Sequence, residues 1–430
     1  MSQKLLRTAI AAGLALALGG CSLFSSDSPR APVKLTEIQQ SATVNTVWST
    51  KLGSSEHSFL TPALAGNGLY AAGSNEVFRI DPSNGAKVWT ASLKEKVVAG
   101  VGSDGYFVAV GTDQGNVVAL SAEGKELWRR KMPSEVDMPP LVGHDLVIVH
   151  TSDTRVTAFN ARTGEQAWYY QGQVPILSVR APRQMIFFAD GILVGQANGK
   201  LIGISLTGKV AFEASISMPS GITEVERLND VVGAPLVTSG VLCAASYQGR
   251  VTCMSAQNGS VRWTEKVDAV TGPTADLKTV YVVDEKSTIH AYSLATGGEL
   301  WKNDTMKYRQ NSAPVAVGSY VASGDYDGYV HLLDPITGRE MGRGRLSGAI
   351  YTTPIAYGDG AIFKRLTENW RSSGQPAAKT AQRDFIFLGN FSHAPVICAC
   401  RSSECREIHT LQPAHQDSGC HCRGLCRPDA

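Results

Sequence analysis

The chain of 430 residues lacks several features that would place it in common classes of protein. Lysine and arginine together number 40 and aspartate and glutamate 38, so no excess of positive charge attracts nucleic acid. Long stretches of helical periodicity are absent. His57, His144, His150, His290 and His331 are scattered without the spacing of a metal site. We therefore expect no nucleic-acid partner, no metal ion and no cofactor.

One repeat returns along most of the sequence instead. The segment 103–132 contains an apolar run at 106–110, a turn at 113–115, a second apolar run at 117–120 and a short strand that carries Trp128. An apolar segment just upstream supplies a fourth strand. Four antiparallel strands in a unit of about 40 residues are typical of a β-propeller blade.

The repeat can be counted by the residue that occupies the position of Trp128. The positions are Trp48, Trp89, Trp128, Trp168, Phe212, Trp263, Trp301 and Met341. Seven whole units precede residue 344, and the strand 44–52 carries Trp48 without strands of its own before it. In propellers such a strand completes the last blade from the opposite terminus. The sequence therefore predicts an all-β, eight-bladed β-propeller of four-stranded antiparallel blades, closed by the N-terminal strand and spanning residues 43–363.

Residues 1–20 have the pattern of a targeting segment. Lys4 and Arg7 precede a short apolar stretch at 10–18, which is too short for an ordinary transmembrane helix. The following Leu18-Gly19-Gly20-Cys21 resembles a bacterial lipobox, which implies cleavage before Cys21 and its acylation. An ordinary secretion signal with an unrelated cysteine is the alternative. Residues 21–42 are rich in Ser, Pro and Asp and read as a flexible tether.

Two connections between units are longer than the others. They are residues 171–182 and 217–230, and both lead from an outer strand to the next blade, so we expect them to lie side by side on one face. Ile176, Leu177 and Val179 are apolar although they fall in the first loop. Exposed apolar residues flanked by charge predict a partner surface. The alternative is that these side chains pack under the loop.

The lipobox, the Ser/Pro tether, the isolated Trp strand and the eight units resemble the BamB family, the lipoprotein subunits of the outer-membrane β-barrel assembly machinery. The resemblance covers about residues 1–363. It implies a non-enzymatic scaffold, lipid-anchored at the periplasmic face of the outer membrane. Such a scaffold binds the POTRA region of the central barrel subunit and assists insertion of outer-membrane proteins, whose unfolded chains are further candidate partners. By position, the family's contact residues correspond to Leu177, Val179, Arg180 and Asp230, while its second acidic position is Val232 here.

The competing hypothesis is an enzyme, because the repeat also resembles the blades of pyrroloquinoline-quinone dehydrogenases. Those enzymes typically use adjacent cysteines, a calcium site and a catalytic aspartate. This chain has no Cys-Cys pair, and Asp81 and Asp334 occupy turn positions that favour aspartate in any case. The segment 100–105 matches GxGxxG, but an alternating strand follows it where a dinucleotide site requires a helix.

Cys243 and Cys253 lie in one predicted hairpin, each five positions from Gln248. A three-residue turn centred on Gln248 would place them opposite one another, within reach of a disulfide. A two-residue turn would instead place the thiols on opposite faces.

The C-terminal segment 364–430 departs from the blade pattern. It contains Cys398, Cys400, Cys405, Cys420, Cys422 and Cys426. Translation out of frame after about residue 363 is the preferred interpretation. A Cys/His metal or disulfide module and an unrelated disordered extension are the alternatives. We therefore expect an incomplete eighth blade and an irregular chain beyond about residue 364.

Overall fold

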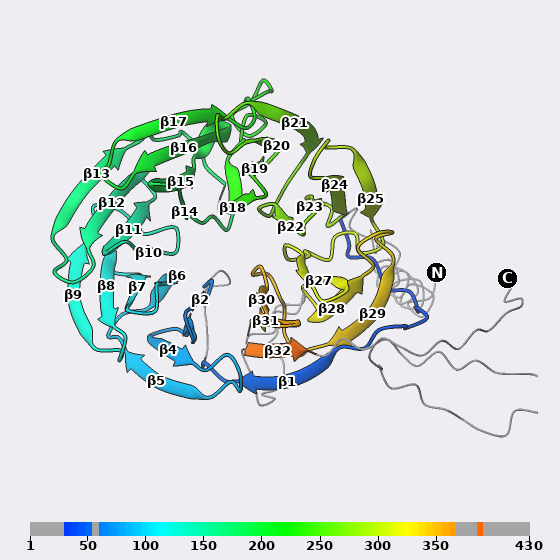
Figure 1. Cartoon of the computed structure of the whole chain (residues 1–430), viewed down its shortest axis with the longest axis horizontal. Helices are drawn as coiled ribbons and strands as arrows, with labels where there is room; N and C mark the ends of the chain where they lie inside the picture. Colours follow the sequence, from blue (N-terminus) through cyan, green and yellow to red (C-terminus); the bar gives the residue numbers. More distant parts are fainter. Residues whose placement is uncertain (1–29, 54–59, 180, 367–384, 390–430) are drawn as a thin grey trace, which may run out of the picture.

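The computed structural model describes residues 30–53, 60–179, 181–366 and 385–389. Within them the strands form eight sheets, each of four antiparallel strands, arranged as blades around a ring (Figure 1). The predicted eight-bladed β-propeller is thereby confirmed.

The first four blades follow one another along the chain, and each runs from an inner to an outer strand. Blade 1 contains β2 (Ala63–Ala65), β3 (Gly68–Ala72), β4 (Glu76–Ile80) and β5 (Lys87–Ser92). Blade 2 contains β6 (Val97–Ser103), β7 (Phe107–Thr112), β8 (Asn116–Ser121) and β9 (Glu126–Lys131). Blade 3 contains β10 (Leu141–Gly143), β11 (Leu146–Thr151), β12 (Arg155–Asn160) and β13 (Gln166–Gln171). Blade 4 contains β14 (Ile186–Phe188), β15 (Gly191–Gly195), β16 (Lys200–Ser205) and β17 (Val210–Ser215), with the 3₁₀ turn η2 (Ala197–Gly199) before β16.

The remaining blades complete the circle, and the last takes one strand from the N-terminal part of the chain. Blade 5 contains β18 (Val231–Thr238), β19 (Val241–Ser246), β20 (Gly249–Ser255) and β21 (Val261–Val267). Blade 6 contains β22 (Thr274–Ala275), β23 (Thr279–Val283), β24 (Ile289–Ser293) and β25 (Glu299–Asn303). Blade 7 contains β26 (Val315–Val317), β27 (Tyr320–Gly324), β28 (Tyr329–Leu333) and β29 (Glu340–Arg345). Blade 8 contains β30 (Ile355–Tyr357), β31 (Gly360–Lys364), β32 (Phe385–Gly389) and β1 (Asn45–Thr50).

The core lies between neighbouring blades. Every residue of β7 is buried, whereas the outer strand β13 alternates between exposed and half-buried side chains. The reason is that a middle strand is covered on each face by one of the two neighbouring blades, whereas an outer strand has one face exposed to solvent. Phe107 and Val117 of blade 2, for example, share one apolar cluster with Val147 and Val149 of blade 3.

Indole side chains join neighbouring blades along the outer rim. In six of the eight seams the Trp of one outer strand donates its Nε1–H to a carbonyl in the turn between the third and fourth strands of the next blade. The pairs are Trp48 with Pro82, Trp89 with Ala122, Trp128 with Ala161, Trp168 with Leu206, Trp263 with Leu294 and Trp301 with Pro335, at 2.7–3.0 Å. The turn ends in glycine because φ is positive there, and because a Cβ at Gly124 or Gly164 would collide with the indole ring.

The prediction of an incomplete eighth blade is wrong. Strand β32 pairs with β31 on one side and with β1 on the other, so the N-terminal strand has its hydrogen-bonding neighbour. Phe387 faces Ile362 and Trp48, and its ring stacks on the indole at 6.0 Å. The propeller therefore continues past residue 363. A short apolar run is enough to fill a strand position, because the ladder is made by backbone groups and does not need the repeat's turn residues.

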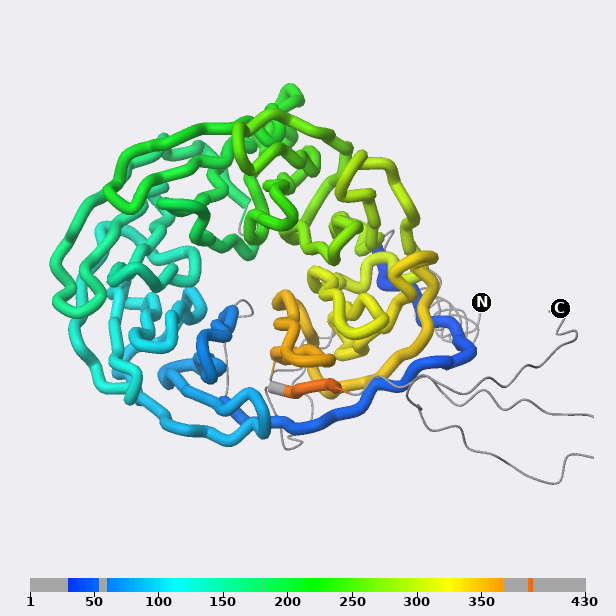
Figure 2. The backbone as a smooth tube through the Cα atoms, in the orientation of Figure 1, coloured from blue at the N-terminus to red at the C-terminus, as the bar shows by residue number. Residues whose placement is uncertain are grey.

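The prediction that residues 21–42 form a flexible tether is also wrong for the part that the structure describes. Residues 30–42 run along blades 6 and 7, as the blue segment beside β29 shows in Figure 2. Val33 N–H donates to the Lys307 carbonyl at 3.0 Å, and Ser41 and Ala42 N–H donate to the Met341 carbonyl at 2.8 and 3.0 Å. Residues 1–29 and 390–430, which include Cys21 and the six tail cysteines, lie outside the described residues. The described residues include no helix long and apolar enough to cross a membrane.

Candidate functional site

Two long loops lie side by side, as the sequence predicts. Loop A (residues 172–185) connects β13 to β14, and loop B (residues 216–230) connects β17 to β18. Val179 N–H in loop A donates to the Asp230 carboxylate at 2.8 Å. Close by, Arg183 forms a parallel bridge with Gly233, with a Gly233 N–H to Pro182 carbonyl distance of 2.7 Å. The end of loop A is thus attached to the first strand of blade 5.

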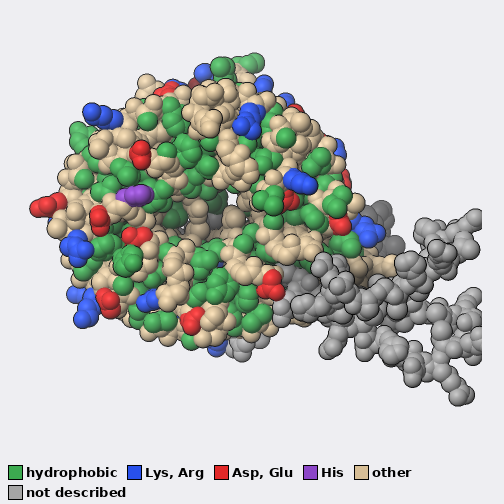
Figure 3. Space-filling view, in the orientation of Figure 1, with side chains coloured by type: hydrophobic (Ala, Val, Ile, Leu, Met, Phe, Trp, Pro, Cys, Tyr) green, Lys and Arg blue, Asp and Glu red, His purple; other side chains and the backbone are tan. Residues whose placement is uncertain are grey.

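Both loops expose apolar side chains, so the alternative that the side chains pack under the loop does not hold for Ile176 and Leu177, whereas Val179 is half-buried. The exposed side chains are Val174, Ile176 and Leu177 of loop A and Met218, Ile222 and Val225 of loop B. Ile176 is 83% exposed and Ile222 is 97% exposed. Loop B projects at the top of Figure 2, and hydrophobic side chains lie at this projection in Figure 3. An apolar surface on both loops has the composition of a protein contact.

Asp230 does not share this exposed surface. Its exposed fraction is 1%, and it lies under loop A with its carboxylate facing Val179. Burial raises the pKa of Asp230, and the hydrogen bond from Val179 N–H acts in the opposite direction. The structure thus corrects the expectation that Asp230 forms one exposed contact surface with Leu177. Val232, at the family's second acidic position, is fully buried, Val179 is half-buried, and Arg180 lies outside the described residues.

The base of loop A is fixed by a partly buried charge cluster. Arg183 Nη2 pairs with Asp137 Oδ2, and Asp137 Oδ1 lies 2.6 Å from His150 Nδ1. Burial acts to raise the pKa of Asp137, but the adjacent His150 and Arg183 outweigh it, and the pKa is lowered. An ionised Asp137 therefore holds the Arg183 end of loop A against blade 3.

Loop B contains its own turn. The Glu226 carboxylate accepts Ile222 N–H at 2.8 Å and Thr223 N–H at 3.1 Å, and Glu226 N–H donates to Thr223 Oγ1 at 3.2 Å. The reciprocal pattern is that of a capping box. The Thr223 and Ile222 N–H groups lower the pKa of Glu226. This turn defines the position from which Ile222 projects.

The disulfide expected from the hairpin is present in the structure. Cys243 faces Cys253 across β19 and β20, their Cα atoms are 4.1 Å apart, and the two sulfurs are bonded. Ala245 pairs with Val251, so the hairpin is centred on Gln248 and the three-residue turn is the one adopted. The bridge is fully buried between blades 5 and 6, in one apolar cluster with Trp263 and Val280.

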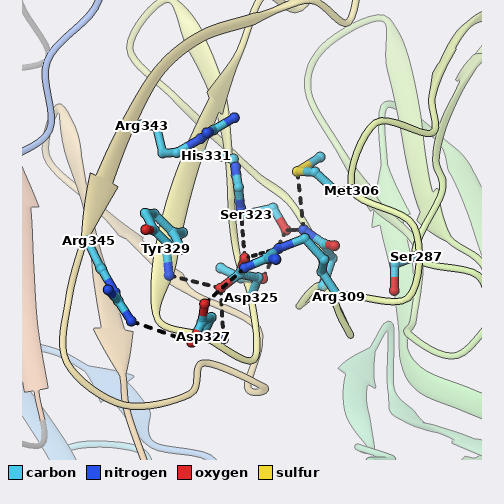
Figure 4. A network of polar contacts seen from close by, with 12 residues as sticks. Ser287, Met306, Arg309, Ser323, Asp325, Asp327, Tyr329, His331, Arg343 and Arg345 are labelled. Carbon is cyan, nitrogen blue, oxygen red and sulfur yellow. Dashed lines mark hydrogen bonds and ion pairs between the residues drawn. The ribbon is translucent and has the colours of Figure 1, made fainter. Parts of the chain in front are cut away.

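A second polar cluster, in blade 7, was not anticipated from the sequence. Figure 4 shows Asp325 between Arg309 and His331, with Arg309 Nε at 2.7 Å and His331 Nε2 at 3.1 Å. His331 Nδ1 contacts Glu340 at 2.6 Å, and Glu340 also pairs with Arg343. The sequence signal is a recurrence, because Asp284, His290 and Glu299 of blade 6 repeat the spacing and the contacts.

This cluster has a structural role. His331 and Asp325 are fully buried. Arg309 Nη1 donates to the Val33 carbonyl at 3.0 Å and Arg343 Nη1 to the Thr36 carbonyl at 3.1 Å, so the cluster holds the N-terminal segment. Among the described residues no group of three or more His, Cys, Asp and Glu side chains is placed to hold a metal ion.

Comparison with known proteins gives consistent matches. The family model described as outer membrane protein assembly factor BamB matches residues 73–303 and 285–372. The chain is 38% identical over 352 residues to the outer membrane protein assembly factor BamB of Burkholderia pseudomallei, covering 81% of this chain and 92% of the relative. It is 37% identical over 343 residues to the protein of that name from Bordetella pertussis, covering 79% and 89% respectively.

Solved structures agree with this match. The crystal structure of BamB from Moraxella catarrhalis aligns with a TM-score of 0.70 at 25% identity, covering 80% of this chain and 99% of that one. A quinohemoprotein alcohol dehydrogenase from Pseudomonas putida aligns with a TM-score of 0.60 at 13% identity, covering 80% and 76%, which shows the fold alone. The named relatives in sequence are assembly factors and not enzymes. The chain therefore belongs to the family of the outer membrane protein assembly factor BamB.

Proposed function

We propose that the protein is a non-enzymatic scaffold lipoprotein of the machinery that assembles outer-membrane β-barrel proteins. It is anchored through acylated Cys21 at the periplasmic face of the outer membrane. Loops A and B bind the POTRA region of the central barrel subunit, and the complex assists insertion of outer-membrane proteins. Membership of the BamB family supports the assembly role, and the paired loops support the choice of surface.

The observation that carries the proposal is the pair of apolar loops held at fixed positions. Leu177, Ile176 and Ile222 are exposed although each loop is fixed at its base by buried polar contacts. A surface that is already ordered loses little conformational entropy when a partner binds. In this arrangement Asp230 acts from beneath as a positioning residue for loop A, and Leu177 and Arg180 make the direct contacts.

The test is capture of the POTRA-bearing partner by variants of this surface. Leu177→Asp and Arg180→Ala are each expected to weaken capture by more than about 1 kcal/mol, roughly fivefold in affinity. The matched control is Leu300→Asp on β25, because Leu300 is 54% exposed and Leu177 is 47% exposed. Undiminished capture by the Leu177→Asp, Arg180→Ala double variant shows that the surface lies elsewhere.

A second pair of variants separates contact from positioning at Asp230. Asp230→Asn keeps an oxygen that can accept the Val179 N–H, whereas Asp230→Ala removes the acceptor. If Asp230 acts only by holding loop A, capture is retained in Asp230→Asn and reduced in Asp230→Ala. Equal loss in both variants shows that the negative charge itself contacts the partner.

The enzymatic alternative is tested directly. Pyrroloquinoline quinone and calcium added to the purified full chain are expected to give neither dye-linked dehydrogenase activity nor a shift in unfolding temperature. Saturable binding of the quinone contradicts the scaffold proposal.

A further inference from the structure

One seam of the propeller differs from all the others. Six are closed by a Trp indole, and the seam between blades 7 and 8 is covered by residues 41 and 42, which bond to Met341. Between blades 4 and 5 the equivalent residue is Phe212. Phenylalanine has no N–H, so it cannot donate to the corresponding carbonyl, which belongs to Ala256.

The Phe212 ring lies over its own blade at this seam. Phe212 faces Gly203 across the ladder, and a Cβ at Gly203 would collide with its ring. In two of the seams that are closed by an indole, Trp128 faces Ala119 and Trp168 faces Ala158. The missing methyl group of Gly203 lets the phenyl ring settle onto its own blade, so the combination of Gly203 and Phe212 leaves the rim of the next blade uncovered.

A cleft opens at this place. It has a volume of about 630 Å³ and is lined on the blade 4 side by Gly203 and Phe212 and on the blade 5 side by Met254, Ala256 and Gly259. A Cβ at Gly259 would meet nothing within 4 Å, whereas at Gly124, Gly164, Gly208 and Gly297 it would meet an indole ring. The blade 5 turn keeps the shape that receives an indole in the other seams, including positive φ at Gly259.

We propose that this cleft binds the indole of a tryptophan side chain presented by another polypeptide. The six closed seams show what the surface is shaped to hold, which is a flat aromatic ring stacked on the turn glycine with its N–H directed at the carbonyl two or three residues earlier. The bound indole donates to the Ala256 carbonyl and packs against Met254 and Phe212. Asp190 and Glu213 also line the cleft, so a lysine or arginine next to the tryptophan strengthens binding.

This site goes beyond the proposed function and is independent of it. It lies in the blade 4–5 seam and uses no residue of loop A or loop B. Loss of partner capture in Leu177→Asp therefore leaves tryptophan binding intact, and loss of tryptophan binding leaves the capture experiment interpretable.

The test uses N-acetyl-5-fluorotryptophanamide as the probe and the purified full chain as the protein. Binding is measured as broadening of the ¹⁹F resonance. The N1-methylated probe, which cannot donate to Ala256, is expected to bind roughly tenfold more weakly, since one hydrogen bond is lost and the methyl group is crowded. The fluorinated phenylalanine analogue is the second comparison and is expected to bind weakly.

Two double variants test the site, one by filling it and the other by creating a second site. Gly203→Ala with Phe212→Trp restores the pair found in other blades, so the chain's own indole fills the cleft, probe binding is lost and the unfolding temperature rises. Ala158→Gly with Trp168→Phe opens the seam between blades 3 and 4 and is expected to add a second site. If the first variant does not fold, the second variant alone tests whether an open seam binds the indole probe. Unchanged broadening in the folded Gly203→Ala, Phe212→Trp variant, or no added capacity in the other, overturns the proposal.

Discussion

Blades 4 and 5 and blades 7 and 8 are built from the same repeat and differ in what surrounds it. Around blades 4 and 5 the repeat carries the exposed loops A and B, the uncovered seam at Phe212 and the buried Cys243–Cys253 bridge. Around blades 7 and 8 the additions close the ring: the N-terminal segment runs along β29, the Asp325 cluster holds that segment, and strand β32 lies between β31 and β1. Blades 4 and 5 thus carry the surfaces suited to partner contact, and blades 7 and 8 carry the elements that close the ring.

The difference shows where a repeat fold can vary without losing stability. Connections between blades and outer-rim positions can change because each blade contacts mainly its neighbours. The closing blade has less freedom, because its strands come from both ends of the chain and a free edge would expose unpaired backbone groups. Changes around blades 7 and 8 are therefore expected to affect stability most, and changes around blades 4 and 5 to affect binding.

The largest expected effect comes from removing strand β32. Replacing residues 385–389 with a Gly/Ser segment of equal length deprives β1 and β31 of their common neighbour and removes the buried side chain of Phe387. The loss of unfolding free energy should exceed the roughly 3–5 kcal/mol typical of a single buried Phe→Ala change. Thermal unfolding and protease resistance measure it.

The matched control is the same replacement in loop B at residues 218–222, where Met218 and Ile222 are exposed. It should leave the unfolding temperature almost unchanged. Comparable losses at the two places contradict the division into a closing side and a contact side.

The next effect is expected at Asp325. Asp325→Asn removes the charge that pairs with buried Arg309 and His331, and breaking a buried pair costs about 3–5 kcal/mol. Asp284→Asn in blade 6 is the control, because the Asp284 side chain is 18% exposed and the Asp325 side chain 0%. Chemical denaturation and the rate of proteolysis within residues 30–42 report the loss. Equal destabilisation by both variants contradicts this account.

A smaller effect is expected from reduction of the Cys243–Cys253 disulfide. The sequence separation of the two cysteines is 10, and a closed loop of this size contributes about 2–3 kcal/mol. Reduction should lower the unfolding temperature and increase proteolysis around blade 5, with blades 7 and 8 unaffected. Mass spectrometry after alkylation measures the state of the thiols. Complete alkylation without a reductant shows that the bridge is absent in the isolated protein.

The smallest effect is expected from pH at His331. Burial acts to lower the pKa of His331, but hydrogen bonds to Asp325 and Glu340 outweigh it and the pKa is raised above 6.5. Protonated His331 therefore contributes stability that is complete below pH 6.5 and is lost as pH rises through the raised pKa. Further charged or titratable groups around this cluster include Arg309, Arg343, Asp327, Tyr329 and Tyr351.

The carboxylates of Asp325 and Glu340 affect stability at acidic pH. The pKa values of Asp325 and Glu340 are lowered, so their contribution is lost only as pH falls through those lowered values. The stability difference between the wild type and His331→Gln should therefore shrink as pH rises from 6 toward 9, measured by denaturation at each pH. A difference that grows over this range contradicts the assignment of a charged His331.

The sequence by itself determined the blade count and the closing strand 44–52, and it brought Cys243 and Cys253 into one hairpin. The tryptophan and glycine positions recur at a period that only a stacked repeat requires, whereas the length of the turn around Gln248, and with it the facing of the two cysteines, was decided by the structure. The sequence also indicated which two loops are long and apolar, because periodicity makes an insertion visible. The side-by-side placement of those loops followed from the shared direction of their connections.

Only the tertiary structure decided how residues far apart in the chain meet. Strand β32 was missed because its role depends on a gap left by β31 and β1, and not on a pattern within residues 385–389. Asp230 was expected at the surface, but the fold buries it, because the end of loop A settles onto the start of blade 5 and needs an acceptor for Val179 N–H. The sequence showed Phe212 only as one more residue at the repeated position. The open cleft beside it depends on Gly203 across the ladder and on the turn of blade 5. Long-range packing fixes such relations, and local periodicity does not encode them.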